Sequence, residues 1–209
     1  MFGIASKPKS YLGVDIGTLS IKIVEISNEE GRPKLENYAI LTDYGLPLKA
    51  PKTFGGGAVM ALKRLMKEGG INAKEVNMSV PIFSSFLTVM ELPQMSELEV
   101  ASAVPFEAKK YIPIPLDSVA LDWSVIGAGD NGKILVLLIA IPRDIIDEYS
   151  IIAKEADLKL LTIELETVSA ARALIGNDPV PAVLIDLGSR DTTISVVDGG
   201  HSRISHSIE

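Results

Sequence analysis

Residues 11–26 read YLGVDIGTLSIKIVEI, and this segment is the most informative about the fold. An apolar strand leads to Asp15, a turn follows at Gly17, and a second strand begins near Ser20. Apolar and polar residues alternate at the start of the second strand, which is typical of a half-buried strand. We therefore expect a β-hairpin whose glycine lets the chain turn tightly and lets backbone N–H groups approach an anion.

The same plan returns near the end of the chain. Residues 182–197 read AVLIDLGSRDTTISVV, again an apolar strand, an Asp-apolar-Gly-hydroxyl turn and a second strand. One such turn is a common hairpin feature, whereas two in matching settings indicate two halves built on one plan. The matching positions are Asp15 and Asp186, Gly17 and Gly188, and Thr18 and Ser189.

This pair of turns has the chemistry of a clamp for nucleotide phosphates. The two hydroxyl side chains add donors to the backbone N–H groups of each turn. Asp15 and Asp186 repel phosphate, but they can hold a hydrated Mg²⁺ that bridges to phosphate oxygens. Strand alternation predicts that Thr18, Ser20 and Lys22 share one face of the hairpin, where Lys22 can reach a β-phosphate as a point charge.

Composition excludes several classes of protein. Of the 209 residues 47% are apolar and 22% are charged, which excludes disorder for most of the chain. The net charge of -7 argues against a nucleic-acid binder, and the absence of cysteine excludes a disulfide scaffold and a thiol nucleophile. The longest apolar run, residues 134–141, is far shorter than the roughly 20 residues of a membrane-spanning helix.

Between the two turns the sequence predicts mixed strands and helices, an α/β or α+β architecture. A turn is expected at 28–33, and strands at 35–41, 76–83, 85–92, 118–126, 133–141 and 158–165. Helices are expected at 58–66, from a Ser96–Glu99 capping box onward, at 145–156 and at 167–175. Pro105 should kink or split the second helix, and the glycines at 55–57 should flank the first.

The paired turns resemble the two phosphate loops of the actin and sugar-kinase superfamily. Residues 164–174, ELETVSAARAL, resemble the helix that connects those loops. In that superfamily an acidic or amide residue near the start of this helix positions the attacking water. The matching catalytic position here is Glu166, with Glu164 as the alternative. A plainer role for Glu166 is to stabilise the positive end of the helix.

The middle of the chain narrows the resemblance to one family. Residues 80–127 are similar to the inserted subdomain of the PilM family of type IV pilus assembly proteins, relatives of the cell-division actin FtsA. Matching runs extend over nearly all of the chain. The runs that are characteristic together are ELP at 91–93, FEA at 106–108, KYIP at 110–113 and LDWSV at 121–125.

The resemblance implies an α/β, actin-like (ribonuclease H-like) fold with an inserted SHS2-like α+β subdomain. It implies subdomain 1A over residues 1–75 and 156–180, the inserted subdomain over 76–155, and the start of subdomain 2A over 181–209. The family continues well beyond Glu209, so we expect the second half to be incomplete. At most a slow ATPase is implied, and no measurable turnover is expected from this chain.

The resemblance also implies a function and partners. The implied protein is a cytoplasmic scaffold at the inner face of the inner membrane. It binds ATP and Mg²⁺, and it docks the N-terminal cytoplasmic tail of PilN. Contacts with other pilus platform and motor proteins and self-association are implied, with no nucleic acid and only indirect membrane contact. In the family the tail lies in a groove between the first subdomain and the inserted one. The apolar candidates for lining that groove are Phe83, Phe86, Leu87 and Tyr111. For each of them the alternative is a position in the hydrophobic core.

Two other functions share the superfamily fold. An FtsA-like cell-division protein would form filaments with ATP, whereas a PilM-like protein would form small oligomers. A sugar-kinase-type phosphotransferase would need a substrate base and a substrate-recognition insert, and the inserted segment instead resembles that of the PilM family.

Overall fold

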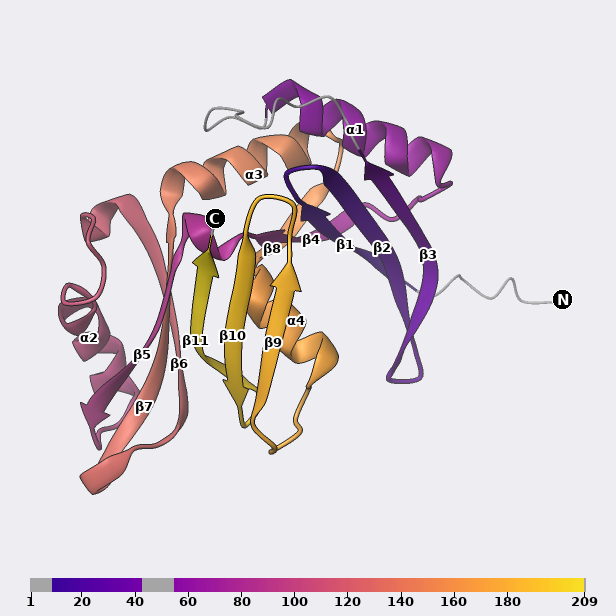
Figure 1. Cartoon of the computed structure of the whole chain (residues 1–209). Coiled ribbons are helices and arrows are strands. Elements are labelled where there is room, and N and C mark those ends of the chain that lie inside the picture. Colours follow the sequence, from indigo (N-terminus) through magenta and orange to yellow (C-terminus); the bar gives the residue numbers. More distant parts are fainter. Residues whose placement is uncertain (1–8, 43–54, 209) are drawn as a thin grey trace, which may run out of the picture. The chain divides into compact units, whose positions relative to one another are not determined.

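The computed structural model describes residues 9–42 and 55–208 (Figure 1). The chain divides into two compact units, and each is described by itself. Unit 1 comprises residues 1–79 and 148–164, and unit 2 comprises residues 80–147 and 165–209. The four-part division implied by the resemblance stays a prediction.

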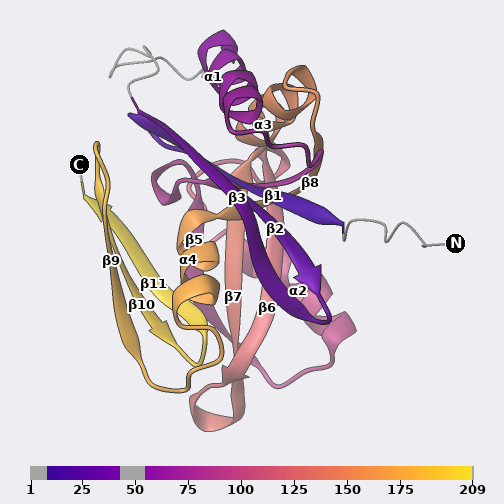
Figure 2. The same cartoon turned by 90° about the vertical axis from the view of Figure 1, so that its right-hand side faces the viewer.

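Unit 1 is built on a five-stranded sheet with strand order β3-β2-β1-β4-β8. The strands are β1 Ser10–Ile16, β2 Ser20–Glu29, β3 Arg32–Thr42, β4 Glu75–Val80 and β8 Lys159–Leu165. β1 is antiparallel to β2 and parallel to β4. Helix α1, Gly55–Glu68, and the second half of α3, Arg143–Glu155, lie side by side on this unit (Figures 1 and 2).

The core of unit 1 follows from alternation along the strands. Every second residue of β1 and of the first half of β2 is buried, and the helices contribute apolar residues at helical spacing. Core side chains exposed by no more than 3% include Leu12, Val14, Ile16, Ile21, Ile23, Leu62, Val76, Met78, Tyr149 and Ile152. The sequence predicted these strands and both helices, and the structure confirms them.

The turn between β2 and β3 is shorter than the predicted turn at 28–33. The strands extend to Glu29 and from Arg32, so only Glu30 and Gly31 remain, with φ of 53° and 83°. Positive φ at both central residues matches the right-handed twist of a hairpin. Asn28 also accepts a hydrogen bond from the Gly31 N–H at 2.8 Å.

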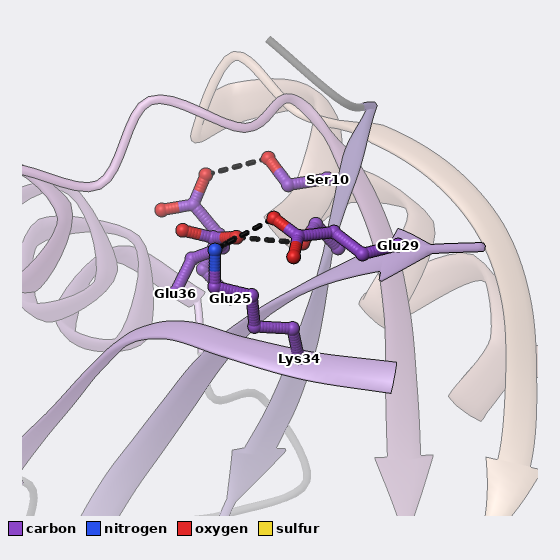
Figure 3. Close-up of polar contacts among 6 residues, drawn as sticks. Ser10, Glu25, Glu29, Lys34 and Glu36 are labelled. Atoms are coloured by element: carbon purple, nitrogen blue, oxygen red, sulfur yellow. Dashed lines mark hydrogen bonds and ion pairs between the residues drawn. The ribbon is translucent and has the colours of Figure 1, made fainter. Parts of the chain in front are cut away.

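Polar side chains connect β2 to its two neighbours in the sheet, β1 and β3 (Figure 3). Lys34 contacts Glu29 at 2.6 Å and Glu36 at 3.4 Å, and these carboxylates raise the pKa of the lysine. Ser10 donates to Glu25 at 2.7 Å (Figure 3). Because Lys34 is exposed to solvent, its pairs orient side chains and contribute little to stability.

Helix α1 differs at its start from the prediction. The glycines at 55–57 form its first turn instead of flanking it. At its end Gly70 has a φ of 63°, and the Ile71 N–H donates to the Met66 carbonyl at 2.9 Å. This is a Schellman ending, which needs a left-handed residue that glycine provides without strain.

Unit 2 contains two three-stranded antiparallel sheets, with orders β5-β7-β6 and β11-β10-β9. The strands are β5 Phe86–Pro93, β6 Val119–Ala128, β7 Lys133–Pro142, β9 Ala182–Leu187, β10 Thr192–Asp198 and β11 His201–Ile208. The helices are α2 Glu97–Ala108 and α4 Glu166–Leu174, with the single turns η1 Ile82–Ser84, η2 Leu116–Ser118 and η3 Asp130–Gly132. None of the helices in the described part of the chain has the length and apolarity that crossing a bilayer requires.

The predicted strand at 76–83 is wrong at its end. β4 stops at Val80, because Pro81 follows and the next three residues form η1. Proline has no backbone N–H for a sheet ladder. The chain therefore leaves the sheet of unit 1 here and begins the first sheet of unit 2 with β5.

Helix α2 packs with the sheet β5-β7-β6 around a core of its own. That core includes Met90, Leu92, Val100, Val104, Ala108, Ile134, Val136 and Leu138. Pro105 was expected to kink or split the helix, yet one continuous helix runs from Glu97 to Ala108. Pro105 and Ala101, the residue four positions earlier, are both exposed, so water can solvate the carbonyl that loses its partner.

The predicted capping box of α2 is confirmed. Ser96 Oγ accepts from the Glu99 N–H at 3.4 Å, and the Glu99 carboxylate accepts from the Ser96 N–H at 2.8 Å. The Ser96 hydroxyl also donates to the Glu99 carboxylate, at 2.8 Å. The hydrogen bonds from Ser96, chiefly the one from its backbone N–H, lower the pKa of Glu99. The stability from Glu99 is therefore present above its unfolded pKa and is lost as the pH falls through its folded pKa.

Replacing Ser96 by alanine will lower the free energy of unfolding of unit 2 by about 1 kcal/mol at neutral pH. The loss should shrink at a pH below the folded pKa of Glu99, where the protonated side chain no longer completes the box. Urea unfolding at both pH values measures it. Ser102→Ala is the matched control, because Ser102 donates only to the Leu98 carbonyl within the helix. Equal losses at both pH values would contradict the coupling to Glu99.

Candidate functional site

The first turn, residues 15–20, links β1 to β2 in unit 1. Its backbone is closed by the Gly17 N–H, which donates to the Ser20 carbonyl at 2.9 Å. A Cβ on Gly17 would lie 3.2 Å from that same oxygen. Glycine suits this close approach of the backbone, because a side chain would force the Ser20 carbonyl to shift by a few tenths of an ångström.

The second turn, residues 186–191, links β9 to β10 in unit 2 and closes in the same way. The Gly188 N–H donates to the Asp191 carbonyl at 2.9 Å, and a Cβ on Gly188 would lie 2.7 Å from that oxygen. The repeat read in the sequence is therefore also a repeat of backbone geometry. Thr18 and Ser189 occupy the same position, directly after the glycine.

The Asp15 carboxylate is held by two neighbours. Lys22 Nζ donates to it at 3.0 Å and Ser79 Oγ at 3.2 Å. Asp15 and Lys22 are partners in the β1–β2 register, so they share a face with Ser20. The sequence argument placed Thr18 on this face by strand alternation. That argument is wrong, because Thr18 lies in the turn, where strand alternation does not apply.

Glu166 and Asp186 line one small cavity in unit 2. Glu166 is the first residue of α4, and its Oε1 accepts from the Ile82 N–H at 3.0 Å. The cavity has a volume of about 20 Å³, which is the space of one water molecule. Its remaining lining residues are Thr167, Ala170, Leu184, Thr193 and Ser195. Glu166 thus lies beside the Asp186 carboxylate and several hydroxyl groups, around a space that fits one water molecule. The alternative candidate, Glu164, lies in β8 of unit 1.

The residues present fit a Mg²⁺–nucleotide. Each turn has a glycine cradle that a Cβ would fill, a hydroxyl donor and an aspartate. Among the residues that the structure describes, no three His, Asp or Glu side chains gather as a metal site. Mg²⁺ often binds through one or two carboxylates together with waters and phosphate oxygens, so an aspartate such as Asp15 or Asp186 suits it.

A larger groove of about 430 Å³ lies within unit 2. All four apolar candidates, Phe83, Phe86, Leu87 and Tyr111, line it. The resemblance implies a groove walled by the first subdomain, whereas the second wall here is β11. The end of β11 lies beside η1 (Figure 1). The lining residues that sequence reasoning missed are Ile82, Ser85, Thr88, Ile112, Leu138, Ser205, His206 and Ser207.

The groove has an apolar floor and a polar wall. Phe83 is 41% exposed, Tyr111 44% exposed, and Ile112 and Leu138 are buried. Ser205 and Ser207 point to the same side of β11, and the spacing of these two serines in a predicted strand was the only sequence signal for this wall. β5 and β11 are both edge strands of their sheets.

Comparisons with known proteins agree with this architecture. The family described as type IV pilus assembly protein PilM matches residues 13–208. A solved PilM–PilN type IV pilus biogenesis complex has a TM-score of 0.79 at 20% identity, covering 95% of this chain and 61% of that one. This chain therefore spans about three fifths of the length of that relative.

Two further structures share the fold. The cytoplasmic domain of EpsL, an inner membrane component of the type II secretion system of Vibrio cholerae, has a TM-score of 0.63 at 10% identity, covering 96% of this chain and 71% of that one. A Bacteroides thetaiotaomicron protein with an actin-like ATPase fold and unknown function has a TM-score of 0.50 at 11% identity, covering 100% of this chain and 73% of that one. The α/β, actin-like fold expected from the sequence is confirmed.

Proposed function

The chain belongs to the family of the type IV pilus assembly protein PilM, and we propose that it is a nucleotide-binding scaffold that docks the N-terminal cytoplasmic tail of a PilN protein. The observation that carries the proposal is the groove of unit 2, with its apolar floor between two edge strands. A similar protein has been solved as a PilM–PilN complex.

The groove suits an extended apolar peptide. An edge strand offers unpaired backbone N–H and C=O groups, so a peptide can add to it as a further strand. Alternate peptide side chains would then face the floor at Phe83, Leu87 and Tyr111, because strand side chains alternate in direction. Burial of aromatic and aliphatic side chains supplies most of the affinity in such docking.

The residues proposed to bind nucleotide are those of the two turns. ATP phosphates would be bound by the backbone N–H groups and hydroxyls of Thr18 and Ser189, with Mg²⁺ held through Asp15 and Asp186. Lys22, now paired with Asp15, can turn to a phosphate oxygen with a small movement of its flexible side chain. Glu166 would orient a water, which at most supports slow hydrolysis.

The proposal includes a location and further partners. A scaffold that holds the tail of an inner-membrane protein works in the cytoplasm, at the inner face of that membrane, and contacts the membrane only through its partner. Residues 76–155 would form the inserted SHS2-like subdomain of the family. Other pilus platform and motor proteins would meet the same scaffold, which can also self-associate.

A titration with a fluorescent peptide tests the proposal. The peptide is the N-terminal cytoplasmic segment of the PilN protein from the same genome, and a scrambled peptide of equal composition is the control. We expect saturable binding with a micromolar or lower dissociation constant, measured by fluorescence anisotropy. Equal anisotropy curves for the two peptides, with a cooperatively folded protein, would overturn the docking function.

A further inference from the structure

We propose that the second turn and the groove are coupled, so that phosphate bound at the turn strengthens docking in the groove. This inference rests on the proposed function. It arises because two residues of the turn, Arg190 and Asp191, each contact a residue that lines the groove.

Arg190 contacts the apolar side of the groove. Its guanidinium carbon lies 4.9 Å from the centroid of the Phe83 ring, the geometry of a cation–π contact. Phe83 lines the groove and is 41% exposed even with this cover. The arginine therefore occupies part of the aromatic surface that a docked apolar segment would use.

Asp191 connects the turn to the polar wall. Its backbone carbonyl closes the turn by accepting from Gly188 at 2.9 Å, and its carboxylate accepts from Ser207 Oγ. Thr193 Oγ1 also donates to this carboxylate at 3.5 Å. A change in the closure of the turn therefore moves a residue that holds the β11 side of the groove.

Phosphate at the turn competes for the arginine. A phosphate cradled by Gly188 and Ser189 would lie one residue from Arg190. Guanidinium–phosphate pairs are bidentate and charge-assisted, so a phosphate competes strongly with the contact that Arg190 makes with the exposed Phe83 ring. The occupied turn would draw Arg190 from the ring and leave the face of Phe83 to the docked segment.

The first turn carries other side chains after its glycine. Leu19 and Ser20 occupy the positions that Arg190 and Asp191 occupy in the second turn. The two turns thus share the glycine closure but differ in the side chains that follow it. This difference assigns the coupling to the second turn alone.

The test measures tail affinity with and without saturating Mg-ATP, in the wild type and in Arg190→Ala. Because coupling between two ligands is reciprocal, the effect can be read from either side. In the wild type Mg-ATP should tighten tail binding by roughly two- to fivefold, the range set by an exposed cation–π contact. Arg190→Ala should bind the tail more tightly without nucleotide and should show no further response to it.

Arg190→Lys completes the design, because it keeps the charge and loses the planar fork. It should show a weaker nucleotide response than the wild type. An unchanged response in Arg190→Ala, or no response in the wild type, would overturn the coupling while leaving the docking function in place. A tail that fails to bind under every condition would instead reject the proposed function and the coupling with it.

Discussion

Replacing Asp15 by alanine will weaken Mg-ATP binding by at least about 100-fold. Removal of a group that only orients a metal ligand already costs about 10- to 100-fold in metal affinity, and Asp15 is proposed to hold the hydrated Mg²⁺ itself. The variant also removes one partner of Lys22, whose Nζ lies 3.0 Å from the carboxylate. The loss of this pair can itself change the attraction between Lys22 and phosphate. Repeating the titration with ATP and no Mg²⁺ separates that change from the loss of the metal.

Isothermal titration measures the affinity, and Glu91→Ala is the matched control. Glu91 is also a carboxylate paired with a lysine, Lys133 at 2.7 Å, on a sheet remote in sequence from either turn. Glu91→Ala should bind Mg-ATP like the wild type. Retained Mg-dependent binding in Asp15→Ala would contradict the assignment of the metal to this residue.

The two turns could be predicted because their cause is local. An aspartate, a glycine and a hydroxyl residue in sequence are enough to specify the chain reversal, and the closures at Gly17 and Gly188 follow from it. The strand ladders around them follow from alternation. Errors came where a neighbour decides the outcome: Pro105 is tolerated because its side of the helix is exposed, which periodicity alone does not reveal.

The groove could be predicted only on one side. Phe83 and Tyr111 stood out as apolar residues of the inserted segment, but β11 begins 118 positions after Phe83 and 90 positions after Tyr111. Contacts at such separation depend on how sheets pack, and a polar alternation such as that of Ser205 and Ser207 is equally typical of a solvated strand. The contact of Arg190 with Phe83 had no sequence signal for the same reason.

Replacing Phe83 by alanine will weaken binding of the PilN tail by roughly 30-fold. Central aromatic residues of an interface cost about 2 kcal/mol or more when truncated, and each 1.4 kcal/mol is a factor of ten. Phe83 is 41% exposed and lies outside the core of the sheet β5-β7-β6, so the variant should fold with an unchanged melting temperature within a few degrees.

Leu98→Ala is the matched control, since Leu98 is an apolar residue of unit 2 that is 82% exposed and does not line the groove. It should bind the tail within about twofold of the wild type, because surface truncations away from an interface change little. The ratio of the two affinities isolates the groove from general surface hydrophobicity. Equal losses in both variants would mean that the tail binds through exposed apolar surface at large, and the groove would lose its assigned role.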